Sequence, residues 1–331
     1  MNDKIMVSIR CITYNHGKFI RRALDSFLMQ KVNFKYEIII HDDASTDDTA
    51  DIIREYESRY PEIIKAVYQK ENQYSQGKNI SIFFENLMRG KYVAYCEGDD
   101  YWTCAEKLQL QVDYLEEHPE CSFTFHNADI VNVDEEFQCV FLPEDMLYSH
   151  VWQNNDMVLE PYQIIELGFI PTASIVARTE LVKKRVPFCK NQVCGDLPLR
   201  LFLAMHGNAY YINKTMSAYR TGNVNSVSGQ AHLSKERVLK TVEGHIKILN
   251  GFNEYSNFKW SQHIEYDIAR RKLRYCINYM DDHLLEAKEL RKLIRSELKT
   301  KYRIRYFLKK ICGEKNYALL KIIYNKIKPS K

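Results

Sequence analysis

The stretch GKYVAYCEGDDYW, residues 90–102, joins a short apolar run directly to an acidic turn. Residues 92–96 have the length and the aromatic and apolar content of a buried strand. Glu97, Asp99 and Asp100 follow without a spacer, and carboxylates this close raise one another's proton affinity unless a cation lies between them. The stretch therefore predicts a site for a hard divalent ion such as Mg²⁺ or Mn²⁺ or, alternatively, a solvated acidic turn before the next helix.

A second acidic segment, residues 42–49, also follows a predicted strand, at residues 37–41. Its carboxylates can accept hydrogen bonds from a ribose or a base, and the helix that follows offers its N-terminus nearby. The alternative is that these residues only begin that helix. Ser45 with Asp48 three residues later is typical of an acidic capping box, so we expect these two residues to open the helix.

Strand-like and helical segments alternate along the first 125 residues. The predicted strands are 7–12, 37–41, 63–68, 92–96 and 121–125, and the predicted helices are 19–28, one after residue 48, 80–88 and 107–117. This alternation predicts β-α-β units and a largely parallel sheet. Both acidic loops then lie at the carboxyl ends of strands, where open α/β sheets bind ligands. Residues 134–160 follow no regular period, and we expect loops there.

Beyond about residue 230 the periodicity is helical only. The predicted helices are 235–252, 262–282, 284–299, 303–312 and 316–328. Residues 290–331 hold 14 Lys and Arg against two Glu, a local balance of +12, which leaves −8 for residues 1–289 because the whole chain carries +4. An acidic body with a basic tail favours an anionic partner for the tail and argues against a nucleic-acid-binding body.

The tail is also amphipathic. Its apolar positions recur at helical spacing, at Ile304, Phe307, Leu308 and Ile311 and again at Leu319, Leu320, Ile323 and Ile327. Such helices can lie on an anionic membrane surface, where each basic residue contributes roughly 1 kcal/mol. The alternative is that they pack on the body with a basic face toward solvent.

Length and composition place the chain among globular proteins. With 331 residues, 45% of them hydrophobic, it can bury the core of one large domain or two modest ones. The nine cysteines contain no C-x-x-C pair, which favours free thiols in a reducing compartment. The N-terminus lacks the pattern of a cleaved signal peptide, and no segment approaches the roughly 18 apolar residues of a membrane span. We therefore expect a cytoplasmic protein.

Three segments, in this order and spacing, resemble the family 2 glycosyltransferases. They are VSIRCITYNHGKFIRRALDSFLMQ (7–30), EIIIHDDASTDDT (37–49) and GKYVAYCEGDDYW with EKLQLQ (90–111). The resemblance covers residues 5–125 closely and 165–225 weakly. It implies an α/β, GT-A-like fold, with a mixed, mainly parallel sheet flanked by helices and a C-terminal helical extension.

The resemblance also implies how the chain is divided. A catalytic domain would span residues 1–228, with a nucleotide-binding half at 1–125 and an acceptor half at 126–228. A helical region at 229–331, ending in the basic amphipathic tail, would follow.

The resemblance assigns nucleotide contacts as well. Ile12 and Tyr14 would cradle the base, and Asp43, with Asp42 as the alternative, would read it. Lys78, beside Asn79, falls where family members contact the nucleotide, unless both are plain surface residues.

The metal motif of the family falls on Asp99 and Asp100, with Asp99 also next to the nucleotide. Glu97 replaces the usual first aspartate, which leaves open whether it contacts the sugar, the ribose or the metal. Trp102 is either a wall of the sugar pocket or a packed core aromatic, and Thr172 lies where family members present a loop to the acceptor.

The segment of weaker resemblance, residues 165–225, supplies the general base of the reaction. Asp196, in the segment CGDLPL (194–199), occupies the position of the carboxylate that deprotonates the acceptor; the alternative is a helix N-cap before Pro198. Arg220, in the Tyr-Arg segment, would contact the nucleotide diphosphate, or else form a surface salt bridge. His16, His41 and His126 lack metal-ligand spacing and are expected to be loop or core histidines.

The function implied is that of an inverting hexosyltransferase. It would use a nucleotide-diphosphate donor, a UDP-sugar, and a divalent metal, and transfer the sugar to a hydroxyl of a glycan in surface polysaccharide synthesis. A lipid-linked glycan at the inner face of the membrane is the implied acceptor. Two alternatives stay open: a non-catalytic nucleotide-sugar-binding scaffold, and a sugar nucleotidyltransferase, which would normally carry a Gly-rich basic loop where residues 13–18 are TYNHGK.

Overall fold

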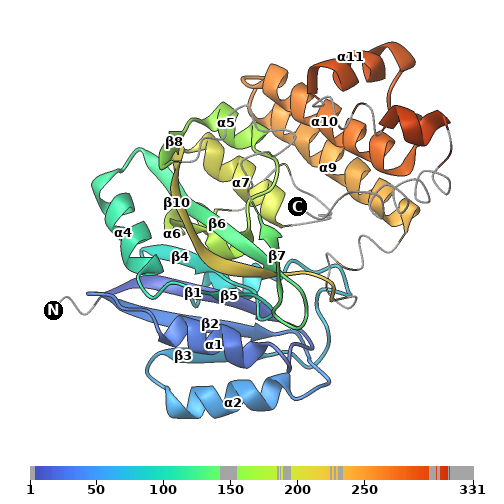
Figure 1. The fold of residues 1–331 in the computed structure, drawn as a ribbon. Helices are drawn as coiled ribbons and strands as arrows, with labels where there is room; N and C mark the ends of the chain where they lie inside the picture. Colours follow the sequence, from blue (N-terminus) through green and yellow to red (C-terminus); the bar gives the residue numbers. More distant parts are fainter. Residues whose placement is uncertain are drawn as a thin grey trace, which may run out of the picture.

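A ten-stranded mixed sheet forms the centre of the protein (Figure 1). The computed structural model describes residues 4–141, 155–184, 195–223, 234–297 and 306–311, with the single residues 186, 188, 226, 229, 303 and 313. The strands are β1 (Ile5–Thr13), β2 (Lys35–Asp42), β3 (Ile64–Tyr68), β4 (Tyr92–Tyr95), β5 (Tyr101–Trp102), β6 (Cys121–Val131), β7 (Phe137–Val140), β8 (Met157–Leu159), β9 (Val176–Arg178) and β10 (Asn208–Arg220).

Helices connect and flank these strands. They are α1 (Ile20–Leu28), α2 (Thr49–Arg59), α3 (Ile82–Glu85), α4 (Lys107–Glu117), α5 (Pro161–Glu166), the 3₁₀ turn η1 (Thr172–Ser174), α6 (Thr179–Val182), α7 (Asp196–Met205), α9 (Lys235–Tyr255), α10 (Ser261–Tyr279) and α11 (Ala287–Glu297).

The sheet has the strand order β3-β2-β1-β4-β9-β6-β10-β5. Strands β3, β2, β1 and β4 are parallel neighbours, as the β-α-β pattern predicts, and β6 and β10 form a second parallel pair. Strand β9 runs antiparallel between β4 and β6, and each antiparallel ladder has only two or three residue pairs. The predicted mixed, mostly parallel α/β sheet is therefore confirmed. Because β2, β1 and β4 are parallel, the loops after them meet at one edge.

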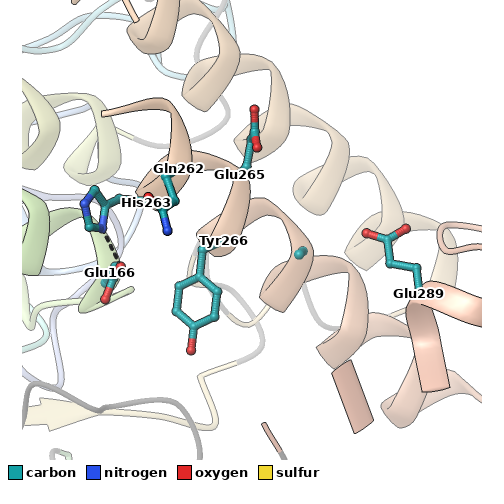
Figure 2. Close-up of a pocket in the computed structure, with 7 residues that line it drawn as sticks. Glu166, Gln262, His263, Glu265, Tyr266 and Glu289 are labelled. Atoms are coloured by element: carbon teal, nitrogen blue, oxygen red, sulfur yellow. Dashed lines mark hydrogen bonds and ion pairs between the residues drawn. The ribbon is translucent and has the colours of Figure 1, made fainter. Parts of the chain in front are cut away.

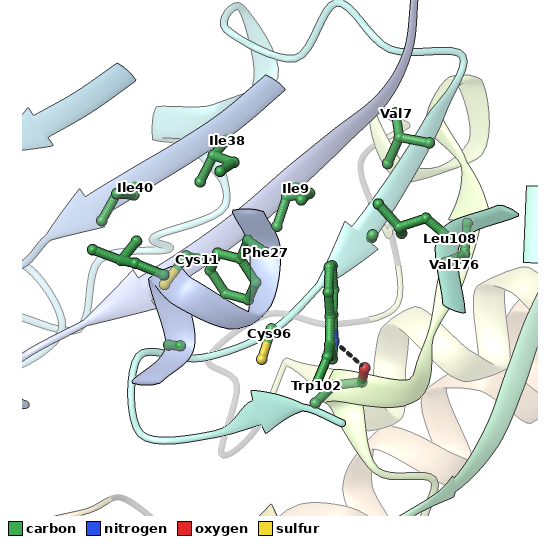
Figure 3. Packing of buried hydrophobic residues seen from close by; sticks show 14 of the residues in the cluster. Val7, Ile9, Cys11, Phe27, Ile38, Ile40, Cys96, Trp102, Leu108 and Val176 are labelled. Atoms are coloured by element: carbon green, nitrogen blue, oxygen red, sulfur yellow. Dashed lines mark hydrogen bonds between the residues drawn. The ribbon is translucent and has the colours of Figure 1, made fainter. Parts of the chain in front are cut away.

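Each face of the sheet is covered by its own hydrophobic cluster. On one face, α1, α2 and α4 pack against alternate residues of β1 such as Ile9 and Cys11, with Phe27 and Trp102 at the centre (Figure 3). On the other face, α3, α5, α6 and α7 pack against residues such as Tyr95 and Phe123. The period-two alternation of β1 thus sends Ser8, Arg10 and Ile12 to this second face.

The C-terminal helices pack directly on the second face of the domain. Phe252 of α9 and Trp260 stack with ring centroids 5.8 Å apart, in a cluster that also contains Ile165 of α5 and Leu201 of α7. Helices α9, α10 and α11 lie together at one end of the molecule (Figure 1). Within the described parts of the chain, none of the helices combines the length and the apolar character needed to cross a bilayer.

The basic tail is described only at 303, 306–311 and 313, so the predicted helix at 316–328 lies outside the described residues. Tyr306, which was not among the predicted apolar positions, is the residue that is buried, and its hydroxyl donates to Asp282 at 3.2 Å. Phe307 and Ile311 are 51% and 82% exposed. The tail therefore packs on the body through Tyr306, while three of the predicted apolar positions, Phe307, Leu308 and Ile311, are exposed.

Three sequence predictions of local structure are wrong. Strand β5 follows the acidic loop directly, where no strand was predicted, because its two residues pair with the long strand β10, which was not predicted either. The expected loop region 134–160 contains β7 and β8. Short strands of this kind form only because a partner strand is already in place, which local sequence does not reveal.

The third wrong prediction is the capping box at the start of α2. Asp48 is the N-cap, but its side chain makes no capping hydrogen bond. Ser45 donates instead to the Asp42 carboxylate, and Asp47 accepts from the backbone N–H of Thr49 at 3.0 Å. Tertiary contacts of Ser45 replace the local cap.

Candidate active site

Three loops meet at the carboxyl edge of the parallel strands. The loop after β4 continues the ladder with β1, since the N–H of Gly98 donates to the carbonyl of Ile12 at 2.9 Å. The loops after β1 and β2 are joined by Asn15, whose N–H donates to Ser45 Oγ at 2.9 Å and whose side-chain oxygen accepts from the N–H of Thr46 at 2.8 Å. The acidic segments predicted from the sequence therefore form one surface.

Close packing fixes the conformation of this surface. A β-carbon at Gly98 would lie 2.6 Å from Thr13 Oγ1 and 3.0 Å from His16 Nδ1, so only glycine fits between the first and fourth strands here. Asn15 and Ala44 have positive φ angles of 55° and 63°. Such a backbone costs about 1 kcal/mol or more for a non-glycine residue and persists only where the surroundings enforce it, often at functional sites.

The acidic loop holds carboxylates that repel one another. Burial raises the pKa of Glu97 to about 7, and the charges of Asp196 and Asp99 add to that rise. Burial, followed by the charges of Asp99 and Glu97, raises the pKa of Asp100 well above its usual range. Within the described part of the chain, no Lys or Arg forms an ion pair with Glu97. The cluster is therefore suited to a cation.

Asp196 joins this cluster from a distant part of the chain. It is the first residue of α7, and Gly195 is the N-cap, so the interpretation of Asp196 as an N-cap is wrong. Burial raises the pKa of Asp196, outweighing a backbone hydrogen bond and the charges of Arg200 and Arg10. Its own charge acts on Glu97, so the predicted base and the predicted metal loop lie in the same site.

Comparison with known proteins agrees with this geometry. The sequence profile described as Glycosyl transferase family 2 matches residues 8–150, which include both acidic loops. The chain contains a glycosyl transferase family 2 domain. Its fold is that of the GT-A enzymes.

Several relatives have similar sequences. The uncharacterised protein Rv1520 of Mycobacterium tuberculosis is 35% identical over 217 residues, which are 65% of this chain and 58% of that protein. The putative teichuronic acid biosynthesis glycosyltransferase TuaG of Bacillus subtilis is 29% identical over 69% of this chain and 83% of its own length. The Escherichia coli UDP-Glc:alpha-D-GlcNAc-diphosphoundecaprenol beta-1,3-glucosyltransferase WfaP is 34% identical over 34% of this chain and 41% of its own length. The match thus spans less than two thirds of the mycobacterial relative.

Solved structures share the fold. S. aureus TarS 1–349 in complex with UDP-GlcNAc has a TM-score of 0.59 at 17% identity, covering 99% of this chain and 93% of that one. The mannosyltransferase PcManGT from Pyrobaculum calidifontis, in complex with GDP-Man and Mn²⁺, has a TM-score of 0.51 at 14% identity, covering 95% and 89%. These similarities establish the architecture of the family 2 domain.

On the nucleotide side of the family 2 domain, Asp43 has two backbone partners. Its carboxylate accepts from the N–H of Gln73 at 2.8 Å and of Tyr74 at 3.0 Å, so it orders the loop after β3. Lys78 lies in that loop, exposed, and its Nζ donates to Gln73 Oε1 at 2.7 Å. Burial raises the pKa of Asp42, although the hydrogen bonds from Ser45 oppose the rise. Of the two residues predicted to read the nucleotide base, Asp43 therefore holds the loop after β3, and the Asp42 carboxylate bonds to Ser45 within the loop after β2.

The remaining predicted contacts differ in exposure. Tyr14 is 39% exposed at the end of β1, open to stack on a base, whereas Ile12 is partly buried against the core. Thr172 is half-buried at the start of η1. Trp102 is only 1% exposed, and its Nε1 donates to the carbonyl of Ala173 at 2.9 Å. The burial favours the packed-aromatic alternative for Trp102 over a wall of the sugar pocket.

Sequence reasoning missed two residues of this site. His16 Nε2 lies 3.6 Å from Asp99 Oδ2. Arg10 packs its guanidinium over the ring of Phe84, 4.6 Å from the centroid, and donates to Ser81 Oγ at 3.1 Å. The available signal for Arg10 was a charge inside the apolar strand VSIRCIT, which needs a polar environment on one face of the sheet.

The donor set fits a hard divalent ion. Glu97, Asp99 and Asp100 offer carboxylate oxygens, the ligands that Mg²⁺ and Mn²⁺ prefer, at mutually unfavourable spacing. Among the described residues, no group of three His, Cys, Asp or Glu converges as a ready-made metal site. A metal that also binds a diphosphate uses only one or two protein carboxylates.

Asp99 and Asp100 are not equivalent in this set. Asp100 is 3% exposed and accepts the backbone N–H of Arg220 at 2.8 Å, whereas the Asp99 side chain is 15% exposed beside His16. Asp99 is thus the more accessible of the two predicted ligands.

Two of the hollows formed by the described residues bear on the location of the site. One, of about 510 Å³, lies beside the loop after β1, lined among others by Asn15, Lys18 and Phe19. The other, of about 550 Å³, lies between α5, α10 and α11, where His263 Nδ1 and Glu166 Oε1 form an ion pair at 2.6 Å (Figure 2). The second is on the C-terminal helices and shares no lining residue with the acidic loop.

Proposed function

We propose that this chain is an inverting glycosyltransferase that moves one sugar from a nucleotide-diphosphate donor to a hydroxyl of a glycan acceptor. The observation that carries the proposal is that Asp196, at the start of α7, lies near enough to Glu97 of the acidic loop for its charge, together with that of Asp99, to raise the Glu97 pKa. Inverting transfer needs a carboxylate base on one side of the sugar and compensation of the charge on the leaving diphosphate on the other. A family 2 domain with both groups in one site is built for that reaction.

Asp196 is the base in this proposal. It takes the proton of the acceptor hydroxyl while that oxygen forms a bond to the anomeric carbon. The bond between this carbon and the diphosphate oxygen breaks, and the nucleoside diphosphate leaves with the electron pair. Arg10 favours the ionised form of Asp196, which is the form that can accept the proton.

Asp99, with Asp100 and Glu97 beside it, is the proposed metal site. A bound Mg²⁺ or Mn²⁺ would neutralise the diphosphate as it leaves. Asp99 is the main ligand because it is the more accessible aspartate, and the Asp100 carboxylate orders the loop through Arg220. Support for manganese comes from PcManGT, whose structure contains it.

The nucleotide would lie over the loops after β1 and β2. Tyr14 would stack on the base at its exposed face, with Ile12 beneath it, and Asp43 or Asp42 would set the position of the loop that covers it. Lys78, in that loop, is the proposed cation for the nucleotide. We propose a UDP-sugar as donor, supported by the UDP-GlcNAc bound in TarS.

The proposed acceptor is a lipid-linked glycan of surface polysaccharide synthesis. TuaG is described as acting in teichuronic acid biosynthesis, and WfaP by name uses a diphosphoundecaprenol-linked sugar. Thr172 and Glu97 would border the acceptor and the sugar. The basic segment 290–331, with Phe307 and Ile311 exposed, would bring the enzyme to the anionic inner face of the membrane.

The test is a screen of UDP- and GDP-sugars for Mn²⁺-dependent thermal stabilisation, followed by measurement of nucleotide release from the donors that bind. We expect release that requires the metal and is lost in Asp196→Asn. Binding of a donor with no metal-dependent release from any of them would support the scaffold alternative instead.

A further inference from the structure

Arg220, the last residue of β10, lies directly behind the acidic loop. Its side chain is 1% exposed. The guanidinium lies over the ring of Phe19, 4.4 Å from the centroid, and over that of Tyr101 at 5.7 Å. A charge buried in this way must be matched by acceptors within the protein.

Both the main chain and the side chain of Arg220 hold the acidic loop. Its backbone N–H donates to Asp100 Oδ1 at 2.8 Å, and its Nε donates to the carbonyl of Asp99 at 2.8 Å. The position of both aspartates therefore depends on where this one residue lies.

The far end of the guanidinium is held by the turn between β6 and β7. One terminal nitrogen donates to the carbonyls of Asn132 at 3.3 Å and Val133 at 3.4 Å, and the other to Glu135 Oε1 at 3.0 Å. Glu135 has a positive φ of 64°, so the turn is held in a strained conformation that directs this carboxylate to the arginine.

We propose that Arg220 is a positioning residue that ties the Asn132–Glu136 turn to the acidic loop, with Glu135 fixing its outer end, and that it is not a ligand of the nucleotide. Four hydrogen bonds from the guanidinium go to protein oxygens, out of the five N–H groups that an arginine has. Because the side chain is only 1% exposed, the guanidinium would have to move away from these acceptors to reach a phosphate. The inference rests on the proposed function, since the acidic loop is the proposed metal site.

The consequence is a metal affinity that depends on a residue outside the site. Glu135 is 42% exposed and lies on a surface turn. Loss of a group that orients a metal ligand weakens metal binding by about ten- to a hundredfold. Loss of the forked hydrogen bonds of the Arg220 guanidinium should therefore weaken Mn²⁺ binding about tenfold. Glu135 contacts Arg220 and not the acidic loop itself, so its loss should weaken Mn²⁺ binding only about threefold.

The experiment measures Mn²⁺ binding to the full chain in the presence of UDP, from the electron paramagnetic resonance signal of free Mn²⁺. UDP binding is measured separately in EDTA by calorimetry. The variants are Arg220→Lys, which keeps the charge but not the fork, and Glu135→Gln. Glu136→Gln is the matched control, because Glu136 lies on the same turn and its carboxylate accepts from Asn132 Nδ2 at 2.8 Å instead of from Arg220.

We expect both variants to weaken Mn²⁺ binding by these factors, with metal-free UDP binding and the control unchanged. Should Arg220→Lys weaken metal-free UDP binding while Glu135→Gln changes nothing, the arginine contacts the nucleotide and the inference is overturned. Unchanged Mn²⁺ binding in both variants overturns it as well. If Arg220→Lys does not fold, Glu135→Gln alone decides. Failure of the unaltered protein to bind Mn²⁺ with UDP would instead remove the proposed function, and the inference with it.

Discussion

Glu37 and Glu97 lie at opposite edges of the parallel part of the sheet, and the charges around them have opposite signs. Glu37, near the start of β2, is fully buried and accepts hydrogen bonds from Ser8 Oγ at 2.7 Å and from the N–H of Arg89 at 2.8 Å, and it pairs with the Arg89 guanidinium at 2.7 Å. Glu97, after β4, has carboxylates as its charged neighbours, and its pKa rises to about 7. Arg10 is the one cation that opposes this rise among the causes of the shift.

The charges around each glutamate indicate whether it stabilises the fold or belongs to a ligand site. A carboxylate whose partners all come from the protein contributes to the stability of the fold. A carboxylate placed among other carboxylates costs folding free energy that a bound cation can offset, and this is typical of a ligand site. The amino edge of the sheet is therefore structural, and the carboxyl edge is the candidate active site.

The largest expected effect is at Asp196. Asp196→Asn removes the proposed base while keeping its shape, so sugar transfer should fall about a thousandfold, as expected for loss of general base catalysis. Donor binding should remain, because the base does not hold the nucleotide. The measurement is transfer rate together with donor-induced thermal stabilisation. Asp113→Asn, an exposed aspartate on α4, is the control, and equal losses in both would remove Asp196 from the role of base.

The second effect is at Asp99. Asp99→Asn should lower Mn²⁺-dependent nucleotide release about a hundredfold, because the proposed metal loses its main charged ligand. Asp100→Asn should lose less, since asparagine can still accept the N–H of Arg220. Nucleotide release over a range of Mn²⁺ concentrations distinguishes the two. An undiminished metal response in both variants would place the ion elsewhere.

The third prediction makes the same substitution, Glu to Gln, at Glu37 and at Glu97. Glu37→Gln breaks a buried charged network and should lower the free energy of unfolding by about 2 kcal/mol. Glu97→Gln should raise it by about 3 kcal/mol at pH 8, because it removes an ionisation that burial makes unfavourable. The folded-state pKa of Glu97 is raised from 4.5 to about 7, so its cost in stability grows as pH rises from about 4.5 to 7, is fully present above 7 and vanishes below about 4.

Urea unfolding in EDTA at pH 5 and pH 8 measures both changes. The gain from Glu97→Gln should be much smaller at pH 5 than at pH 8. The loss from Glu37→Gln should be present at both. Two variants that lose the same stability at pH 8 would contradict the distinction between the two edges.

The smallest effect is a shift in the pH profile. Arg10 lowers the pKa of Asp196, so Arg10→Met should raise that pKa and move the acidic limb of the transfer rate to higher pH. Activity then falls off at a higher pH, because the base must be ionised to accept a proton. Rate profiles from pH 5 to 9 measure the shift, with Arg54→Met on the exposed surface of α2 as control; coincident profiles would exclude Arg10 from the electrostatics of the site.

Much of this arrangement could be predicted from the sequence. The parallel strands, the acidic loops at their ends and the start of α9 at Lys235 follow from apolar periodicity and turn residues, which are local properties. The predicted helix at residues 80–88 is shortened to α3, Ile82–Glu85, and β10 was not predicted at all. Both depend on packing partners that are distant in the sequence.

The sequence by itself determined the family, the succession of strands along the first 125 residues and the presence of closely spaced carboxylates, because these are properties of neighbouring residues. Only the tertiary structure decided what each charge does. It paired Glu37 with Arg89, brought Asp196 to Glu97, and enclosed Arg220 behind Asp99. The reason is physical: the energy of a charge depends on burial and on neighbours in space, and folding brings those neighbours together from segments that are far apart along the chain.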